Sequence, residues 1–175
     1  MSDLYIAPHA EWLRPYIDLE ARMIGLVHST RAELADQIRN EGLNLEAARQ
    51  HREHSEGDVD AIYCALATPE RPNTFFGALL ERSVHVRFRY SIDQVSIRLF
   101  PLFNKNGSLP KEGYPLVEYL ASEPQELQRL LSQLNINVND SILKALTLSY
   151  ADLWEFLIFK DIPRDTKMSI DDIQA

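Results

Sequence analysis

The sequence predicts a single domain of the α+β class that spans residues 1–175. Short apolar runs typical of buried strands are mixed with amphipathic helical segments, without the regular alternation of a doubly wound sheet. A chain of 175 residues, 45% of them hydrophobic, is long enough to bury a core without metals or disulfides. The single cysteine, Cys64, cannot form an internal disulfide, which fits a reducing compartment.

Composition also narrows the choice of partners and location. The chain carries 18 Lys and Arg against 26 Asp and Glu, a net charge of −8 that repels nucleic-acid phosphate on average. A protein partner is therefore favoured over DNA or RNA. No basic N-terminal region precedes an apolar segment, and no apolar run approaches the ~18 residues of a membrane span. We expect a soluble cytoplasmic protein with no membrane partner, which a secretion system could also deliver into a target cell.

The first elements are a short helix, a strand and a longer helix. Residues 8–17 mix aromatic and polar side chains, and Pro15 limits them to a short helix at the edge of the core. Residues 22–27 form an apolar, β-compatible run. The spacing Thr30-x-x-Glu33 is a capping box, which predicts that a helix begins directly behind this strand. His28 is therefore expected at a strand-to-helix junction.

The helix after this junction is predicted to end at Gly42, a residue that tolerates positive φ. Its buried face is formed by Leu34, Ala35 and Ile38. Residues 44–60 are polar and read as a turn of helix followed by a loop. His51 and His54 could share a helical face and bind a metal, but no third ligand has a suitable spacing. We interpret them as surface residues.

Two strands are expected in the middle of the chain. Residues 61–66 form a compact apolar run that predicts a central strand. Residues 75–82 read as a short helix. Residues 83–90 alternate clearly between apolar and polar side chains, so they predict a half-buried strand. Its polar face, which we expect to be solvated, carries His85, Arg87 and Arg89.

Two further strands and a helix are expected before residue 137. Residues 95–100 and 115–121 both read as strands, and the second contains Glu118. An acid in an apolar strand is costly unless it is paired or used. The spacing Ser122-x-x-Gln125 predicts the cap of an amphipathic helix. The apolar positions of that helix are Leu127, Leu130, Leu131 and Leu134.

The C-terminal part is predicted to be helical. Residues 138–160 form a helical extension to a core of about residues 22–132. In this extension, Ser149-x-x-Asp152 caps a helix whose apolar residues are Leu153, Trp154, Phe156 and Leu157. Residues 164–175 are mostly polar and read as a mobile tail. The common glycine-rich nucleotide motifs and zinc motifs are absent from the sequence.

Three short motifs share one order along the chain. Leu26-Val27-His28-Ser29-Thr30 is followed by a helix and Gly42-Leu43, then by Ala61-Ile62-Tyr63-Cys64-Ala65, and finally by Glu118-Tyr119. In this order and context they resemble the ADP-ribosyltransferase superfamily. The resemblance is to its histidine–tyrosine–glutamate branch, which includes diphtheria toxin and the poly(ADP-ribose) polymerases. It implies a split, strongly bent β-sheet with flanking helices.

The resemblance also implies an activity, the transfer of ADP-ribose from NAD to a macromolecular acceptor with release of nicotinamide. One unit per acceptor is favoured, since no segment would hold a growing polymer. The catalytic residues it implies are Glu118, His28 and Tyr63, and the NAD-binding residues are His28, Ser29, Thr30, Tyr63, Phe75 and Phe76. NAD is the substrate and no metal is expected. A toxin or effector would fit this activity.

Each of these residues would have a physical role. Breaking the nicotinamide bond develops oxocarbenium character at the ribose, and Glu118 would stabilise that charge and accept a hydrogen bond from the 2′-hydroxyl. His28 would bind the adenosine ribose hydroxyls, and the backbone of Ser29 the nicotinamide amide. Tyr63 would stack on the nicotinamide ring, with Phe75 or Phe76 as the second aromatic.

Some residues depart from the family pattern. Ser29 stands where the branch has glycine, Cys64 replaces an aromatic residue, and Thr74 is the nearest counterpart of a usual serine. Other interpretations stay open: a chance arrangement of these residues, a family fold that has lost activity, or an NAD glycohydrolase that uses the same cleft. An acidic, non-catalytic interaction or inhibitor module is the alternative from another class.

Overall fold

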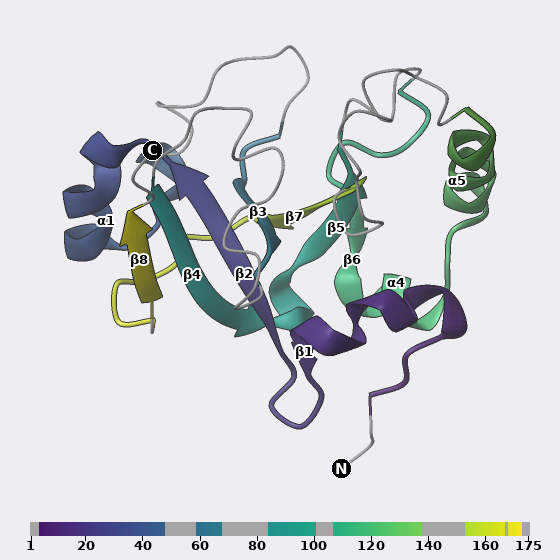
Figure 1. Ribbon diagram of the computed structural model, residues 1–175, viewed down its shortest axis with the longest axis horizontal. Helices are drawn as coiled ribbons and strands as arrows, with labels where there is room; N and C mark the ends of the chain where they lie inside the picture. Colours follow the sequence, from purple (N-terminus) through teal and green to yellow (C-terminus); the bar gives the residue numbers. More distant parts are fainter. Residues whose placement is uncertain are drawn as a thin grey trace.

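The computed structural model describes residues 4–47, 59–67, 84–100, 107–137, 153–166 and 168–172. These residues form an antiparallel sheet with short helices around it, which confirms the predicted α+β class (Figure 1). Helices marked η are of the 3-10 type. The elements are η1 (Pro8–Tyr16), β1 (Ile17–Asp18), β2 (Met23–Thr30), η2 (Ala32–Leu34), α1 (Ala35–Glu41), β3 (Ile62–Leu66), β4 (Val84–Ser91), η3 (Ile92–Gln94), β5 (Ser96–Leu99), β6 (Tyr114–Pro115), α4 (Leu116–Ala121), α5 (Gln125–Asn137), β7 (Trp154–Ile158) and β8 (Met168–Asp172).

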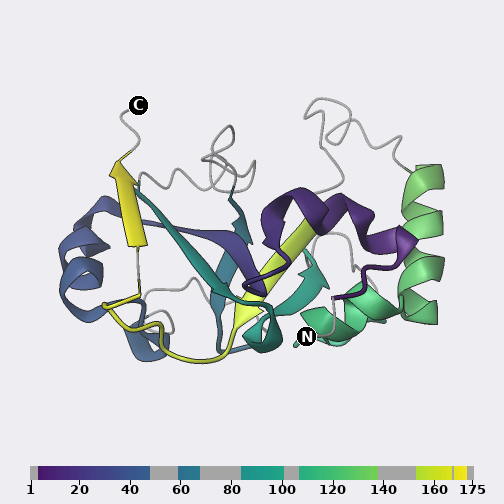
Figure 2. The same ribbon diagram turned by 90° about the horizontal axis from the view of Figure 1, so that it is seen from below.

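The sheet consists of two halves joined by a narrow seam. In the described part of the chain, its strands run in the order β6-β5-β7-β3-β2-β4-β8, and β1 also pairs with β2. Strand β2 pairs with β4 along its whole length, from Met23 to Thr30. Its pairing with β3 covers only Leu26 with Leu66 and Val27 with Ala65. We call this β2–β3 contact the seam. Helix α1 lies at one end of the molecule and α5 at the other (Figures 1 and 2).

The core extends across both halves of the sheet, and several of its largest buried side chains come from β7, α4 and η1. Trp154 and Phe156 of β7 are fully buried, and so is Tyr119 of α4. The Trp12 ring of η1 stacks on Trp154 with their centroids 5.6 Å apart. The main-chain amide of Ala7 donates to the Leu120 carbonyl at 2.8 Å, so the segment before Ile17 covers the core edge, as predicted.

Several predicted elements are confirmed. Strands β3, β4 and β5 lie where the apolar runs predict them. Helix α1 buries Ala35 and Ile38 and ends at Gly42, which has φ 79°. A Cβ at Gly42 would run into the backbone of Ile162 and Pro163. Glycine is therefore required here on steric as well as conformational grounds.

The predicted start of the first helix is wrong. Strand β2 continues to Thr30, so His28 lies inside the strand and not at a strand-to-helix junction. The Thr30-x-x-Glu33 spacing does not form a capping box: η2 follows Arg31 and α1 follows Leu34, and neither of these N-cap positions makes a side-chain cap hydrogen bond. The pairing of β2 with β4 accounts for the longer strand, since Thr30 pairs with Val84.

Within the predicted strand 115–121, Leu116–Ala121 form helix α4, and only Pro115 belongs to a strand, β6. Leu116, Tyr119 and Leu120 are its buried residues, at the i, i+3, i+4 spacing of a helix. Pro115 at the N-cap supplies its fixed φ at the helix start. Glu118 lies in the first turn with an exposed side chain. The predicted amphipathic helix is present as α5, but it begins at Gln125, and Ser122, its predicted N-cap, is instead the C-cap of α4.

Two predictions for the C-terminal part are also wrong. Within the predicted helical extension, Trp154–Ile158 form strand β7, which is buried at every position between β3 and β5. A fully buried strand shows no polar–apolar alternation, so its apolar run can be mistaken for a buried helix. Met168–Asp172 of the predicted mobile tail form β8, which pairs with β4 along five residues.

Candidate functional site

His28 contacts Tyr63 across the seam. Its Nδ1 lies 2.8 Å from the main-chain carbonyl of Tyr63. A carbonyl only accepts hydrogen bonds, so Nδ1 carries the proton and donates it. Alternation along β2 would place His28 on the face of its neighbour Val86, but a bond to a strand carbonyl directs the ring between the strands. The His28 ring thus lies at the seam, just beyond the last β2–β3 pair.

Ser29 contacts a buried histidine on the neighbouring strand. Its hydroxyl is 2.7 Å from Nδ1 of His85, with which it pairs in the β2–β4 ladder. His85 is only 1% exposed, so the prediction of a solvated polar face on β4 is wrong at this residue. The next residue of β2, Thr30, is buried too. The ring of His85 thereby orients the Ser29 side chain, at the position where the family resemblance implies glycine.

The Tyr63 ring is held at two points. Its hydroxyl donates to the carbonyl of Val59, and the guanidinium of Arg98 lies over the ring, 5.1 Å from its centroid. Such a cation–π contact stabilises the pair more strongly when both groups are withdrawn from water. Arg98 comes from β5, so this contact crosses β7 and ties β3 to β5.

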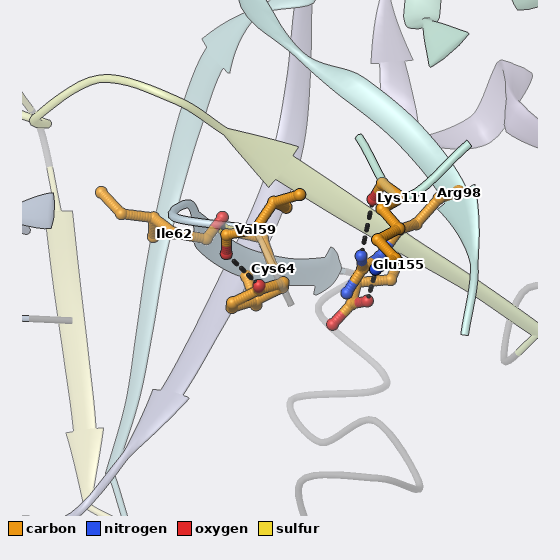
Figure 3. Close-up of polar contacts among 7 residues, drawn as sticks. Val59, Ile62, Cys64, Arg98, Lys111 and Glu155 are labelled. Atoms are coloured by element: carbon orange, nitrogen blue, oxygen red, sulfur yellow. Dashed lines mark hydrogen bonds and ion pairs between the residues drawn. The ribbon is translucent and has the colours of Figure 1, made fainter. Parts of the chain in front are cut away.

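Arg98 forms a buried ion pair with Glu155. Its Nε donates to a Glu155 carboxylate oxygen at 2.8 Å, and its Nη1 donates to the Lys111 carbonyl at 2.7 Å (Figure 3). The two residues are 7% and 8% exposed. Glu155 is the one buried acidic residue in the part of the chain that the structure describes. Burying these charges costs several kcal/mol each unless they are paired and hydrogen-bonded, as they are here.

A tight turn presents the Lys111 carbonyl to Arg98. The amide of Gly113 donates to the Pro110 carbonyl at 3.2 Å, and Gly113 has φ 71°. A Cβ at Gly113 would lie 2.9 Å from the Cβ of Arg98 and would also run into the backbone of Ile97. Only glycine lets the turn approach β5 this closely.

Register places three of these side chains on one face of the sheet. Tyr63 pairs with Leu157, and Glu155 is two residues from Leu157 on the same strand. Residues two apart on a strand share a face, so Tyr63 and Glu155 do so. Arg98 pairs with Glu155 and joins them. We call Tyr63, Arg98 and Glu155 the buried triad.

The pKa of the Cys64 thiol depends on burial and on the charge of Glu155. Burial raises the pKa of its thiol, and the negative charge of Glu155 raises it further. The Cys64 thiol lies 3.8 Å from the Ile62 carbonyl, a weak hydrogen bond inside the same strand. The thiol is thus a buried neutral group on the strand next to β7, and not a nucleophile.

The structure brings some of the sequence-predicted site residues together and leaves others apart. His28, Ser29, Thr30 and Tyr63 lie at or next to the seam. Glu118, in contrast, is exposed on α4, which packs on η1, η3, β5 and β6. Phe75 and Phe76, like His51 and His54, lie outside the described residues.

The sequence reasoning missed Arg98 and Glu155. Glu155 stands in the run Leu153-Trp154-Glu155-Phe156-Leu157, a single acid among apolar residues. The rule that drew attention to Glu118 applies equally to Glu155, because an acid in an apolar strand must be paired or used. Because residues 149–157 are interpreted as a helix in the sequence analysis, the rule was not applied to Glu155.

Comparisons with known proteins do not test the resemblance to the ADP-ribosyltransferase superfamily, which is supported by the sequence motifs alone. No protein-family model, curated protein or solved structure matches this chain. Among the helices within the described ranges, none is long and apolar enough to cross a membrane. The same residues contain no group of three His, Cys, Asp or Glu side chains arranged to hold a metal ion.

Proposed function

We propose that this protein binds NAD beside the seam and transfers ADP-ribose from it to a macromolecular acceptor, releasing nicotinamide. The observation that carries the proposal is the chain of contacts from His28 through Tyr63 and Arg98 to the buried carboxylate of Glu155. These contacts connect His28 and Tyr63, which belong to two of the family-like motifs, with the Glu155 carboxylate, which is buried away from water. The finer family fold, a split ADP-ribosyltransferase sheet, belongs to the same proposal and is favoured by the narrow seam.

In this proposal Glu155 replaces Glu118 as the catalytic carboxylate. Departure of nicotinamide leaves positive charge on the ribose, as in glycoside hydrolysis. A fixed carboxylate stabilises that charge more strongly where water is excluded, and Glu155 is buried whereas Glu118 is exposed. Glu155 would accept a hydrogen bond from the 2′-hydroxyl and face the developing cation.

Tyr63 and His28 would hold the dinucleotide in place. The Tyr63 ring is fixed by its hydroxyl and by Arg98, so it would offer a rigid surface for the nicotinamide ring. His28 donates from Nδ1 to the Tyr63 carbonyl, so in the neutral ring Nε2 carries the lone pair and is the kind of atom that could accept from a ribose hydroxyl. Ser29 and Thr30 would line the path between these two residues.

The acceptor is proposed to be a protein, and the transfer to stop at one unit. With a net charge of −8, the chain repels phosphate on average and favours basic or neutral protein surfaces. A cytoplasmic site of action, either in the producing cell or in a cell that receives the protein, is part of the proposal.

Transfer of label from NAD tests the function. The protein is incubated with NAD labelled in its adenylate phosphate and with cell lysate, and both macromolecular label and free nicotinamide are measured. We expect label on protein with the wild type, a loss of at least about a hundredfold with Glu155→Gln, and a rate near wild type with the matched control Glu118→Gln.

Each of the remaining outcomes would support a different catalytic residue or a different function. Loss of transfer in Glu118→Gln alone would restore the assignment made from the sequence motif. Nicotinamide release without label would identify an NAD glycohydrolase. Neither product from the folded wild type would contradict the enzyme proposal and support a non-catalytic module. Circular dichroism and calorimetric NAD binding show whether Glu155→Gln is still folded.

A further inference from the structure

Arg98 is the one buried cationic residue among those described, and its contacts go beyond a simple ion pair. One guanidinium reaches the Glu155 carboxylate, the Lys111 carbonyl and the face of the Tyr63 ring. An arginine fork has donors at fixed angles, so these three contacts leave it little freedom. Two of the side chains that it contacts, Glu155 and Tyr63, are the ones that the proposed function assigns to the ribose and the nicotinamide.

We propose that Arg98 is a positioning residue that keeps Glu155 ionised and aimed and holds the Tyr63 ring in register with it. This inference rests on the proposed function and deepens it. Arg98 itself would not touch NAD in its present position, because its side chain is committed to Glu155, Lys111 and Tyr63. Its effect would pass through the charge and geometry of the other two members of the buried triad.

The charges around Glu155 give this inference a pH signature. Arg98 contacts Glu155 from β5, and the Cys64 thiol, on the opposite face of β3 from Tyr63, is a neutral group whose pKa the charge of Glu155 raises. A cation in contact favours the ionised carboxylate, whereas burial favours the protonated form. Removing the cation removes this stabilisation of the ionised form while burial remains, so Glu155 would take up its proton at a higher pH. Activity that depends on the carboxylate would then fail at a higher pH too.

The test compares Arg98→Gln and Arg98→Lys with the wild type. For the active wild type, we expect the acidic limb of the kcat profile to move up by at least about one pH unit in Arg98→Gln. Arg98→Lys should restore most of this shift, since it keeps the charge, but not all of kcat, since it loses the fork. KM for NAD should change less than kcat in both variants.

A control and a direct titration complete the test. Arg22→Gln removes the exposed ion pair with Asp93 and should leave the profile unchanged. The Glu155 carboxyl carbon, assigned by NMR through its loss in Glu155→Gln, should titrate at a higher pH in Arg98→Gln than in the wild type. An unchanged titration, or equal losses of kcat in both Arg98 variants at every pH, would overturn the inference. Absence of NAD turnover in the wild type would instead refute the proposed function, and the titration alone would then decide the role of Arg98.

Discussion

At the scale of single residues, the most informative feature is the buried ion pair of Arg98 and Glu155. Arg98 and Glu155 are almost fully withdrawn from water, and each compensates the other. The sequence showed both residues inside apolar runs, but their pairing joins β5 to β7 and depends on a register that no local pattern contains. Glu118, by contrast, is an ordinary exposed acid in the first turn of a helix, where the helix dipole favours it.

Cys64 provides a residue-scale prediction. Because burial and the charge of Glu155 both raise the pKa of its thiol, little reactive thiolate forms near neutral pH. We expect a disulfide reagent such as dithionitrobenzoate to label Cys64 at pH 8 only as the chain unfolds in urea. Rapid labelling of the native protein would mean that β3 is not packed against its neighbours as described.

At the scale of elements, sequence periodicity identifies a strand or helix that has one buried face, whereas an apolar run buried on both faces fits either a strand or a helix. Strand β4 alternates and was found, and α1 was found from its apolar face. Strand β7 is buried at every position, so its apolar run was mistaken for a helix. In α4, Leu116, Tyr119 and Leu120 have helical spacing, but the run from 115 to 121 is so apolar that it also fits the strand in which the sequence analysis places Glu118.

The turn that ends at Gly113 gives an element-scale prediction. Gly113→Ala would strain a positive φ and push against Arg98 and Ile97, whereas Gly107→Ala strains a similar φ, 65°, with nothing within 4 Å. We expect the free energy of unfolding in urea to fall by about 1 kcal/mol for Gly107→Ala. Gly113→Ala should lose at least about 2 kcal/mol, together with NAD turnover. Equal losses would show that the turn does not pack on β5.

At the scale of the whole molecule, the two halves of the sheet meet at a seam only two residue pairs wide. His28 and Tyr63 lie on the two strands that meet at this seam. Sequence reasoning singled out both residues because each stands in a recognisable motif. It could not place β7 between β3 and β5, since that order joins segments far apart in the chain. It also left β8 out of the sheet, because a short polar strand carries a weak pattern.

Strand β8 supports a whole-molecule prediction. It covers the edge of β4 along five residue pairs, so deletion of residues 167–175 would expose that edge. We expect the midpoint of thermal unfolding to fall by at least about 5 °C and the amides of β4 to lose protection in hydrogen exchange. Unchanged protection of β4 in the shortened chain would contradict this pairing.

The most direct test of the central claim is a crystal structure of Glu155→Gln with NAD bound. The variant should hold the dinucleotide intact because the cation-stabilising carboxylate is gone. We predict the nicotinamide ring against Tyr63 and the 2′-hydroxyl of its ribose within hydrogen-bond distance, about 3.5 Å or less, of the residue 155 side chain. NAD bound beside Glu118, or on the far side of the sheet from Tyr63, would contradict the account.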